Sequence, residues 1–280
     1  MDEVSIVRFF EDDLPFGKSL TDQEGWDRTV AIWKRMLRVE PNGFFKATFA
    51  GKDVGIAAVL RYDRVAWINS VIVSAQYRDR GVGSALMKEC LSCAWDSGAE
   101  SVRLDSIAGF EPFYAKFGFK EEYPSLRFAR TGEGCSCDAD EMTEGDLADV
   151  VSFDRALTGM DRGKVIESIF RDSPRSAFIV RDSEGVRGYL LSSPCDGRID
   201  LGPCVCRPKD ARCASILVKS AMDVDPRKKY RICVSGKNLA AAGLMRDMGF
   251  VEFVPATRMS QGKRFVESES SYAMISPAEG

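Results

Sequence analysis

The same order of strand-like and helix-like segments occurs twice along this chain, at a nearly constant spacing. In the first half, Gly55 lies in a strand-like run and Gly118-Phe119 follows a helix-like run. Gly188 and Gly249-Phe250 take the corresponding places in the second half, at offsets of 133 (188 − 55) and 131 (249 − 118). Two independent landmarks at almost one offset indicate a duplicated domain rather than chance. The 280 residues are enough for two domains, each with its own hydrophobic core.

Three strand-like runs open the first half and are separated by short polar turns of the kind that joins hairpins. They are Phe44 to Ala50, Val54 to Tyr62 and Val65 to Val73, and we expect an antiparallel meander. The apolar spacing of residues 82–94 predicts a helix after the third strand.

The rest of the first half is expected to add a strand from Ser101 to Asp105, a helix opened by Pro112 and a last strand through Phe128. The polar, glycine-bearing segment 131–144 is predicted to be a linker. The predicted domains are therefore residues 1–130 and 145–280.

The composition excludes several classes of site and partner. The chain has no histidine, which rules out Ser-His and Cys-His nucleophilic pairs and histidine zinc sites. The net charge is −3 and positive and negative residues are interspersed, so we expect no binding to nucleic acid. No apolar run approaches the ~20 residues that span a bilayer, and the acidic N-terminus lacks the pattern of a secretory signal. We therefore expect a cytoplasmic protein that does not contact a membrane.

The nine cysteines are expected to be reduced thiols, and no metal is predicted. Cys90 and Cys93 have a metal-like spacing, but they lie in one predicted helix and no matching pair follows. The pairs Cys135/Cys137 and Cys204/Cys206 are closer together than zinc sites usually require.

The segment between the third strand and the next helix has the features of a phosphate-binding loop. Gly81 and Gly83 would let a ligand approach the backbone N–H groups at the start of the helix, where the helix dipole favours negative charge. Arg78 and Arg80 add positive charge, and Ser84 can donate a hydroxyl hydrogen bond. The Gly-Lys signature of nucleoside triphosphate loops is missing. The pattern favours a diphosphate site over the alternative of a tight turn with solvated arginines.

This loop resembles the acetyl-CoA loop of the GNAT acyltransferase superfamily, Arg/Gln-x-x-Gly-x-Gly/Ala, and Arg78, Gly81 and Gly83 match its fixed positions. The family's later signature, a tyrosine in a helix shortly before Gly-Phe, is matched by Tyr114 and Gly118-Phe119. The second half resembles the divergent second domain of two-domain GNAT proteins. The resemblance implies an α/β fold of tandem GNAT-like domains, each a mixed, mostly antiparallel sheet flanked by helices.

The resemblance also implies acetyl-CoA, or coenzyme A, as co-substrate. The main chain of Val71, Ile72 and Val73 would pair with the pantetheine arm as an added strand does. The diphosphate would be held by Arg78, Asp79, Arg80, Gly81, Val82, Gly83 and Ser84.

Tyr114 is the residue that the resemblance assigns to protonation of the leaving thiolate. A thiol has a reference pKa of ~8.5 and a tyrosine of ~10, so a positioned tyrosine can share or donate a proton to the sulfur. The alternative is an aromatic side chain that packs a short helix onto the sheet.

The general base stays open, because the strand residues Trp67 to Ser70 include no carboxylate at a place where the family often has one. A solvated or capping role explains each candidate as well: Glu24, Asp27, Asp105 and Asp161.

Two further residues are candidates for substrate contact. The resemblance implies that Trp26 reaches the acceptor pocket, although core packing with Trp33 also explains it. Arg162 could clamp a substrate carboxylate or phosphate, although an ordinary surface or capping pair explains it as well.

The second half departs from the pattern at both functional positions. Residues 207–214 contain no glycine, and Met245 stands four residues before Gly249, where the first half has Tyr114. We therefore expect the second domain to bind no coenzyme A and to act as scaffold and substrate wall.

The predicted reaction is transfer of an acetyl group from acetyl-CoA to a primary amine. A small-molecule amine is favoured, because the second domain should close the groove that a peptide needs. The alternatives are a peptide or protein N-acetyltransferase and a non-catalytic module that binds or senses acyl-CoA. The sequence leaves the acceptor, the acyl length and the oligomeric state open.

Overall fold

The computed structural model describes residues 4–26, 28–132 and 139–280. The chain divides into two compact units: unit 1 comprises residues 1–104 and 260–264, and unit 2 comprises residues 105–259 and 265–280. Asp27 and the Cys135/Cys137 pair lie outside the described residues. None of the helices in the described part is both long and apolar enough to cross a membrane.

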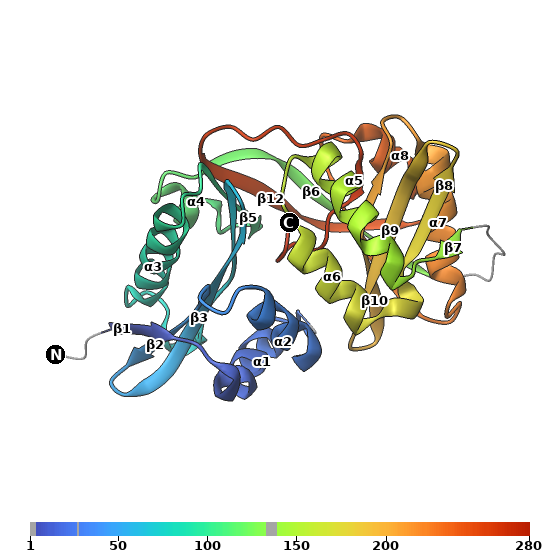
Figure 1. Cartoon of the computed structure of the whole chain (residues 1–280). Coiled ribbons are helices and arrows are strands. Elements are labelled where there is room, and N and C mark those ends of the chain that lie inside the picture. Colours follow the sequence, from blue (N-terminus) through green and yellow to red (C-terminus); the bar gives the residue numbers. More distant parts are fainter. Residues whose placement is uncertain (1–3, 27, 133–138) are drawn as a thin grey trace. The chain divides into compact units, whose positions relative to one another are not determined.

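Unit 1 is a sheet with helices on both faces (Figure 1). Its strands lie in the order β1 to β5, and neighbours are antiparallel except for the parallel pair β4 and β5. Helix α3 packs on β3 and β4, on the opposite side from α1 and α2. The elements are β1 (Val4–Arg8), α1 (Leu14–Gln23), α2 (Val30–Val39), β2 (Phe44–Phe49), β3 (Lys52–Tyr62), β4 (Val65–Val73), α3 (Val82–Asp96) and β5 (Ser101–Ile107).

The antiparallel meander predicted for residues 44–73 is confirmed by the pairing of β2 with β3 and of β3 with β4. Strand β3 is buried from Val54 to Leu60, as expected where helices cover both faces of a sheet. Gly55 lets α3 lie close to β3, because a Cβ there would stand 2.9 Å from Ile72 O and 3.2 Å from a methyl of Leu86. This packing sets the start of α3 at the end of β4.

Unit 2 is also a mixed sheet, in the order β12-β6-β11-β10-β9-β8-β7, with β13 paired to β10. One cluster of buried residues is formed by α7, α8 and the strands that they pack on, and both helices can be followed in Figure 1. The elements are α4 (Glu111–Ala115), β6 (Lys120–Thr131), β7 (Asp140–Glu141), α5 (Leu147–Thr158), α6 (Gly163–Asp172), β8 (Phe178–Asp182), β9 (Gly185–Cys195), β10 (Arg198–Cys206), α7 (Ala211–Asp223), β11 (Lys229–Ser235), α8 (Leu239–Asp247), β12 (Val251–Gly262) and β13 (Ser271–Ala273).

Strand β6 is the last strand of the first half of the sequence but pairs with a strand of the second half. Its antiparallel ladder with β11 runs from Ser125 opposite Ser235 to Thr131 opposite Lys229. In turn, residues 260–264 belong to unit 1, where the Lys263 backbone N–H donates to Glu100 O at 2.7 Å. The compact units follow this exchange of strands. The boundaries predicted at residues 130 and 145 follow the sequence repeat and stay a prediction.

The repeat recurs in the backbone hydrogen bonds. Ser74 N donates to Val54 O at 2.8 Å, and Arg207 N donates to Arg187 O at 2.9 Å, an offset of 133 at both ends (207 − 74 and 187 − 54). The end of β4 in unit 1 is therefore equivalent to the end of β10 in unit 2. The tandem arrangement expected from the sequence is confirmed.

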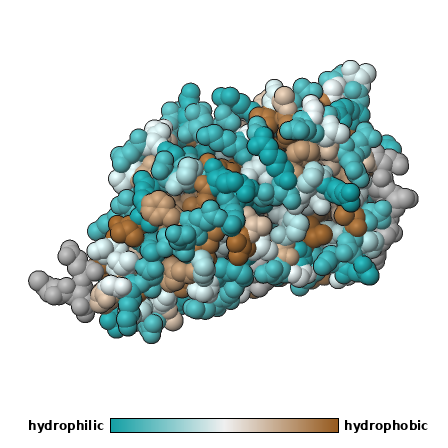
Figure 2. Space-filling model, turned by 60° about the horizontal axis from the view of Figure 1, so that its bottom comes forward, coloured by the Kyte–Doolittle hydropathy of each residue, from teal (hydrophilic) through white to brown (hydrophobic). Residues whose placement is uncertain are grey.

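Hydrophobic side chains on the face shown in Figure 2 are interspersed with hydrophilic ones. Two of the most exposed large apolar residues lie in β12 and the others lie elsewhere in the chain, and scattered exposures of this kind are ordinary in globular proteins. They are Phe10, Leu239, Val251, Val254 and Val266.

Candidate active site

The loop between β4 and α3 adopts a left-handed backbone at two positions. Asp79 has φ +61° and Gly81 has φ +81°. Apart from the glycine, its chain neighbours and the backbone of its own helix, no atom of the described residues lies within 4 Å of the place where a Cβ of Gly81 would stand. The glycine is therefore needed for its backbone conformation, and the space beside it is open to a ligand.

The N-terminus of α3 has no side-chain cap. Gly81 is the N-cap residue, and the first bond into the helix joins Ala85 N to Gly81 O at 3.0 Å. The N–H groups of Val82, Gly83 and Ser84 precede that bond and have no acceptor within the helix. Three such donors at the positive end of a helix dipole suit the oxygens of a diphosphate.

The two arginines of the loop have different partners. Arg78 donates from Nε to Val73 O at 3.0 Å and forms an ion pair with Glu24, so it joins the loop to β4 and to the end of α1. The Arg80 guanidinium lies over the rings of Phe49 and Tyr77, at 5.6 and 5.8 Å from their centroids. Both arginines are exposed, so their charge lies at the surface of the loop.

The equivalent helix of unit 2, α7, is capped by its own chain. Asp210 accepts a hydrogen bond from Cys213 N at 3.0 Å and pairs with Arg187. The hydrogen bond from Arg187 is the main reason that the pKa of Asp210 lies below its usual value. A carboxylate thus holds the place that an anionic ligand would need.

The connection to this helix is also shorter in unit 2. Eight residue steps lead from Ser74 to Val82 at the start of α3, whereas four lead from the equivalent Arg207 to Ala211 at the start of α7. The connection in the second half is therefore too short to form the loop that carries the glycines in the first half.

Strand β4 parts from β5 before it reaches this loop. The parallel ladder joins Val65, Ala66 and Trp67 of β4 to residues 101–103 and ends there. From Ile68 to Val73, the side of β4 toward β5 has no strand partner in the ladder, which leaves main-chain groups available to an extended ligand. The predicted pantetheine contacts, Val71 to Val73, lie in this open part.

A β-bulge interrupts β4 at Ser70. Its φ is +54°, and the register with β3 shifts between Ile56 and Ala58. Arg28 Nη1 donates to Ser70 Oγ at 2.6 Å, and Ser70 Oγ donates to Asn69 Oδ1 at 2.7 Å. All three residues are buried.

None of the residues predicted from the sequence belongs to this polar cluster of Arg28, Ser70 and Asn69. The signal in the sequence is a pair of polar residues inside an otherwise apolar strand, Asn69-Ser70. The Arg28 guanidinium also lies over the rings of Trp26 and Trp33, at 6.0 and 5.1 Å. Trp26, a predicted substrate contact, is thus next to the cluster.

Tyr114 lies in α4 of unit 2, between two aromatic neighbours. Its ring makes T-shaped contacts with Phe113 and Phe119, at centroid distances of 5.1 and 6.3 Å. The backbone N–H of Phe119 donates to Tyr114 O, as that of Phe250 does to Met245 O, so Tyr114 and Met245 are equivalent positions.

The two equivalent side chains differ in exposure. Met245 is fully buried, whereas Tyr114 is partly exposed. The fold is therefore satisfied by an apolar side chain at this position and does not itself require a tyrosine.

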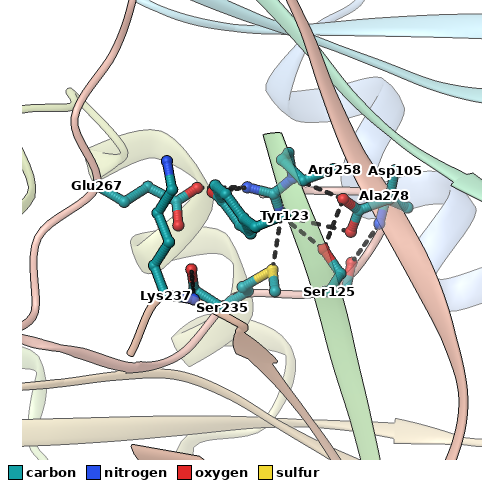
Figure 3. A network of polar contacts seen from close by, with 10 residues as sticks. Asp105, Tyr123, Ser125, Ser235, Lys237, Arg258, Glu267 and Ala278 are labelled. Atoms are coloured by element: carbon teal, nitrogen blue, oxygen red, sulfur yellow. Dashed lines mark hydrogen bonds and ion pairs between the residues drawn. The ribbon is translucent and has the colours of Figure 1, made fainter. Parts of the chain in front are cut away.

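Asp105 is part of a buried ionic network within unit 2 (Figure 3). It pairs with Arg258 at 2.6 Å and accepts from Ser125 Oγ at 2.8 Å, and its side chain is 1% exposed. Arg258 also pairs with Glu267 and donates to Tyr123 Oη at 3.1 Å. Burial opposes the charge of Arg258, but the carboxylates of Asp105 and Glu267 outweigh it and raise its pKa.

Arg162 has a comparable partner inside unit 2. Its guanidinium donates to both carboxylate oxygens of Asp154, at 3.0 and 2.5 Å, and Tyr189 Oη donates to the same carboxylate at 2.6 Å. Burial, followed by the charge of Asp154, raises the pKa of Tyr189 well above its usual value. Asp161 is exposed and lies 3.7 Å from Arg155. Substrate roles for Asp105, Asp161 and Arg162 stay predictions.

The described cysteines are free thiols. Cys90 and Cys93 both lie in α3, and burial raises the pKa of each thiol. Over residues 4–26, 28–132 and 139–280, no three side chains of His, Cys, Asp or Glu are grouped so that they could hold a metal ion.

The two halves of the chain match models of the same protein family. A model described as an acetyltransferase (GNAT) domain matches residues 40–121, and a second model with that description matches residues 150–273. Together they cover most of the chain.

Individual relatives and one solved structure agree with the two models. A holothin acyltransferase of Pseudoalteromonas sp. is 24% identical over 246 residues, which are 86% of this chain and 82% of the relative. YitH of Bacillus subtilis, an uncharacterised N-acetyltransferase, is 23% identical over 282 residues and 98% of both chains. The crystal structure of a putative acetyltransferase from Pyrococcus horikoshii has the same fold, with a TM-score of 0.82 at 22% identity over 99% of this chain and 96% of that one.

Both halves thus carry the fold, and of the two equivalent helices, α7 has a side-chain cap at its N-terminus and α3 has none. The chain belongs to the GNAT superfamily and is an acyltransferase with two GNAT domains.

Proposed function

We propose that this acyltransferase moves an acetyl group from acetyl-CoA to the primary amine of a small molecule, at one active site per chain. The observation that carries the proposal is the difference between two equivalent helices. The N-terminus of α3 has three N–H groups without an acceptor in the helix and no side-chain cap, whereas that of α7 is capped by Asp210. One half is thus built to receive an anion, and the other supplies its own.

The residues of the first half have separate roles in the proposed reaction. The loop of residues 78–84 holds the diphosphate, and the open side of β4 at Val71 to Val73 pairs with the pantetheine. The amine nitrogen then attacks the thioester carbonyl carbon and forms the C–N bond as the C–S bond breaks. The sulfur leaves with the bonding electron pair and takes the proton of Tyr114. The proton lost by the nitrogen returns to the tyrosine through water, so that the products are the amide and the free thiol.

Isothermal titration calorimetry with acetyl-CoA tests the loop. The wild-type chain should bind one equivalent, and Arg80→Glu should abolish binding by placing a negative charge beside the diphosphate. Two equivalents per chain would contradict the assignment of one cofactor site.

Steady-state kinetics test the tyrosine. Tyr114→Phe should lower kcat by about 100-fold, because general acid catalysis contributes on this scale, and should leave acetyl-CoA affinity unchanged. The matched control is Tyr230→Phe, which removes a hydroxyl whose one proton is within reach of both Met222 O and Asp225 O inside unit 2. An unchanged kcat in Tyr114→Phe, or an equal loss in both variants, would rule out the acid role.

The acceptor class needs a screen of amino sugars, amino acids, polyamines and peptides. Holothin belongs in the screen, because a relative over most of the chain is named as a holothin acyltransferase. Turnover of peptides alone would overturn the small-molecule proposal and favour peptide or protein N-acetylation.

A further inference from the structure

The side chain of Asn69 presents a hydrogen-bond donor that nothing in the described part of the chain uses. Asn69 is 7% exposed, and its Nδ2 atom is buried without a partner there. A buried amide donor without an acceptor costs ~1–3 kcal/mol, so such groups in native proteins call for an explanation.

The neighbouring residues fix how this amide is turned. Its Oδ1 accepts from the Ser70 hydroxyl, and the Ser70 oxygen in turn accepts from Arg28. If the amide were flipped, the hydroxyl proton of Ser70 would lose its acceptor. The chain of hydrogen bonds begins at a cation and polarises each bond that follows, which makes Nδ2 a better donor.

The position of Asn69 along β4 indicates which oxygen it meets. The diphosphate loop follows Ser74, and β4 runs back from there through Val73 and Val71 to Asn69. The five residue steps from Asn69 to Ser74 span at most about 17 Å, because the bulge at Ser70 shortens the strand. This span is comparable to an extended pantetheine arm, so the thioester end of the arm reaches Asn69. The ladder to β5 ends at Trp67, so β4 is open toward β5 at Asn69 itself.

We infer that Asn69 Nδ2 donates to the carbonyl oxygen of the acyl group. Arg28 and Ser70 are positioning residues, because they act through the orientation of the amide. The inference rests on the proposed function and deepens it. As the amine attacks, negative charge develops on that oxygen, so the bond is stronger in the transition state than in the ground state.

The test compares binding of acetyl-CoA with binding of coenzyme A, which lacks the acyl oxygen. Titration calorimetry of Asn69→Ala should show acetyl-CoA affinity reduced by about 10-fold, with coenzyme A affinity within about 2-fold of wild type. Ser70→Ala removes the hydroxyl that orients the Asn69 amide but keeps the amide itself. It should lower acetyl-CoA affinity less than Asn69→Ala does. It keeps the inference testable if Asn69→Ala fails to fold.

The matched control is Asn238→Ala. The Asn238 amide is fully satisfied: Oδ1 caps α8 by accepting from Ala241 N, and Nδ2 donates to Glu269 O and Ser271 O. This variant should lower thermal stability and leave the ratio of the two affinities as in wild type.

Equal loss of both ligands in Asn69→Ala, or no loss of either, would overturn the role of Asn69 while leaving the acetyl-CoA proposal intact. Absence of acetyl-CoA binding to the wild-type chain would overturn the proposed function itself. The two failures are therefore distinguishable.

Discussion

Substitution of Gly81 by alanine separates two reasons for a glycine in the loop: its left-handed backbone conformation, and the access that it gives a diphosphate to the N–H groups of α3. Its φ of +81° is strained for any residue with a Cβ, and beyond its own neighbourhood in the chain no described atom lies within 4 Å of the place where that Cβ would stand. The stability cost therefore comes from the backbone alone and should be about 1–2 kcal/mol. For a chain of this size, each kcal/mol lowers the melting temperature by about 2–4 °C.

The expected effect on binding of acetyl-CoA is larger. A Cβ at Gly81 would lie beside the free N–H groups of α3 and hold the diphosphate away from them. Loss of one hydrogen bond to a charged acceptor costs about 1.5–3 kcal/mol, which raises the dissociation constant by about 10- to 150-fold. Calorimetric titration measures this directly.

Gly98 provides the matched control in the same unit. It has φ +86°, has no atom within 4 Å of its Cβ position, and follows the other end of α3. Gly98→Ala should lose the same stability as Gly81→Ala and keep wild-type acetyl-CoA affinity. Equal affinities in the two variants would refute the idea that the glycine admits a ligand.

Two predictions concern unit 2. Arg162→Leu leaves the buried carboxylate of Asp154 without its cation and should destabilise the chain by about 3–5 kcal/mol, and a loss below 1 kcal/mol in urea unfolding would contradict this. Asp210 has a depressed pKa, so its stabilisation is fully present above its unfolded pKa of about 4 and is lost as pH falls through the lower folded value. Asp210→Asn keeps the helix cap but removes the charge that Arg187 pairs with. The free energy of unfolding should therefore fall less below pH 4 in this variant than in wild type, and the same pH profile in both would contradict this prediction.

The comparison of the two halves shows why the loop and the tyrosine could be predicted together. The loop depends on local chemistry: glycines at a strand-to-helix turn, next to arginines, predict an anion site wherever the segment lies. The position of Tyr114 could be matched to Met245 by counting from Gly-Phe, and both positions accept the same backbone hydrogen bond. These features follow from short stretches of chain and do not depend on distant contacts.

The partners of charged residues could not be predicted in this way. The sequence neighbours of Arg162 predict a substrate clamp, and the structure pairs its guanidinium with Asp154. Asp105 pairs with Arg258, which lies 153 residues away in the sequence. Such pairs depend on how whole helices and strands pack together, and a local sequence pattern does not predict that packing.

The sequence by itself determined the duplication, the meander and the identity of the half that carries the loop, because periodicity, turn residues and glycine positions are local properties. Only the tertiary structure decided that β6 pairs with β11, that Asp210 caps α7, and that the Nδ2 of Asn69 is buried without a partner among the described residues. Strand pairing, capping by a side chain and burial of a donor each depend on the folded backbone that brings these groups together.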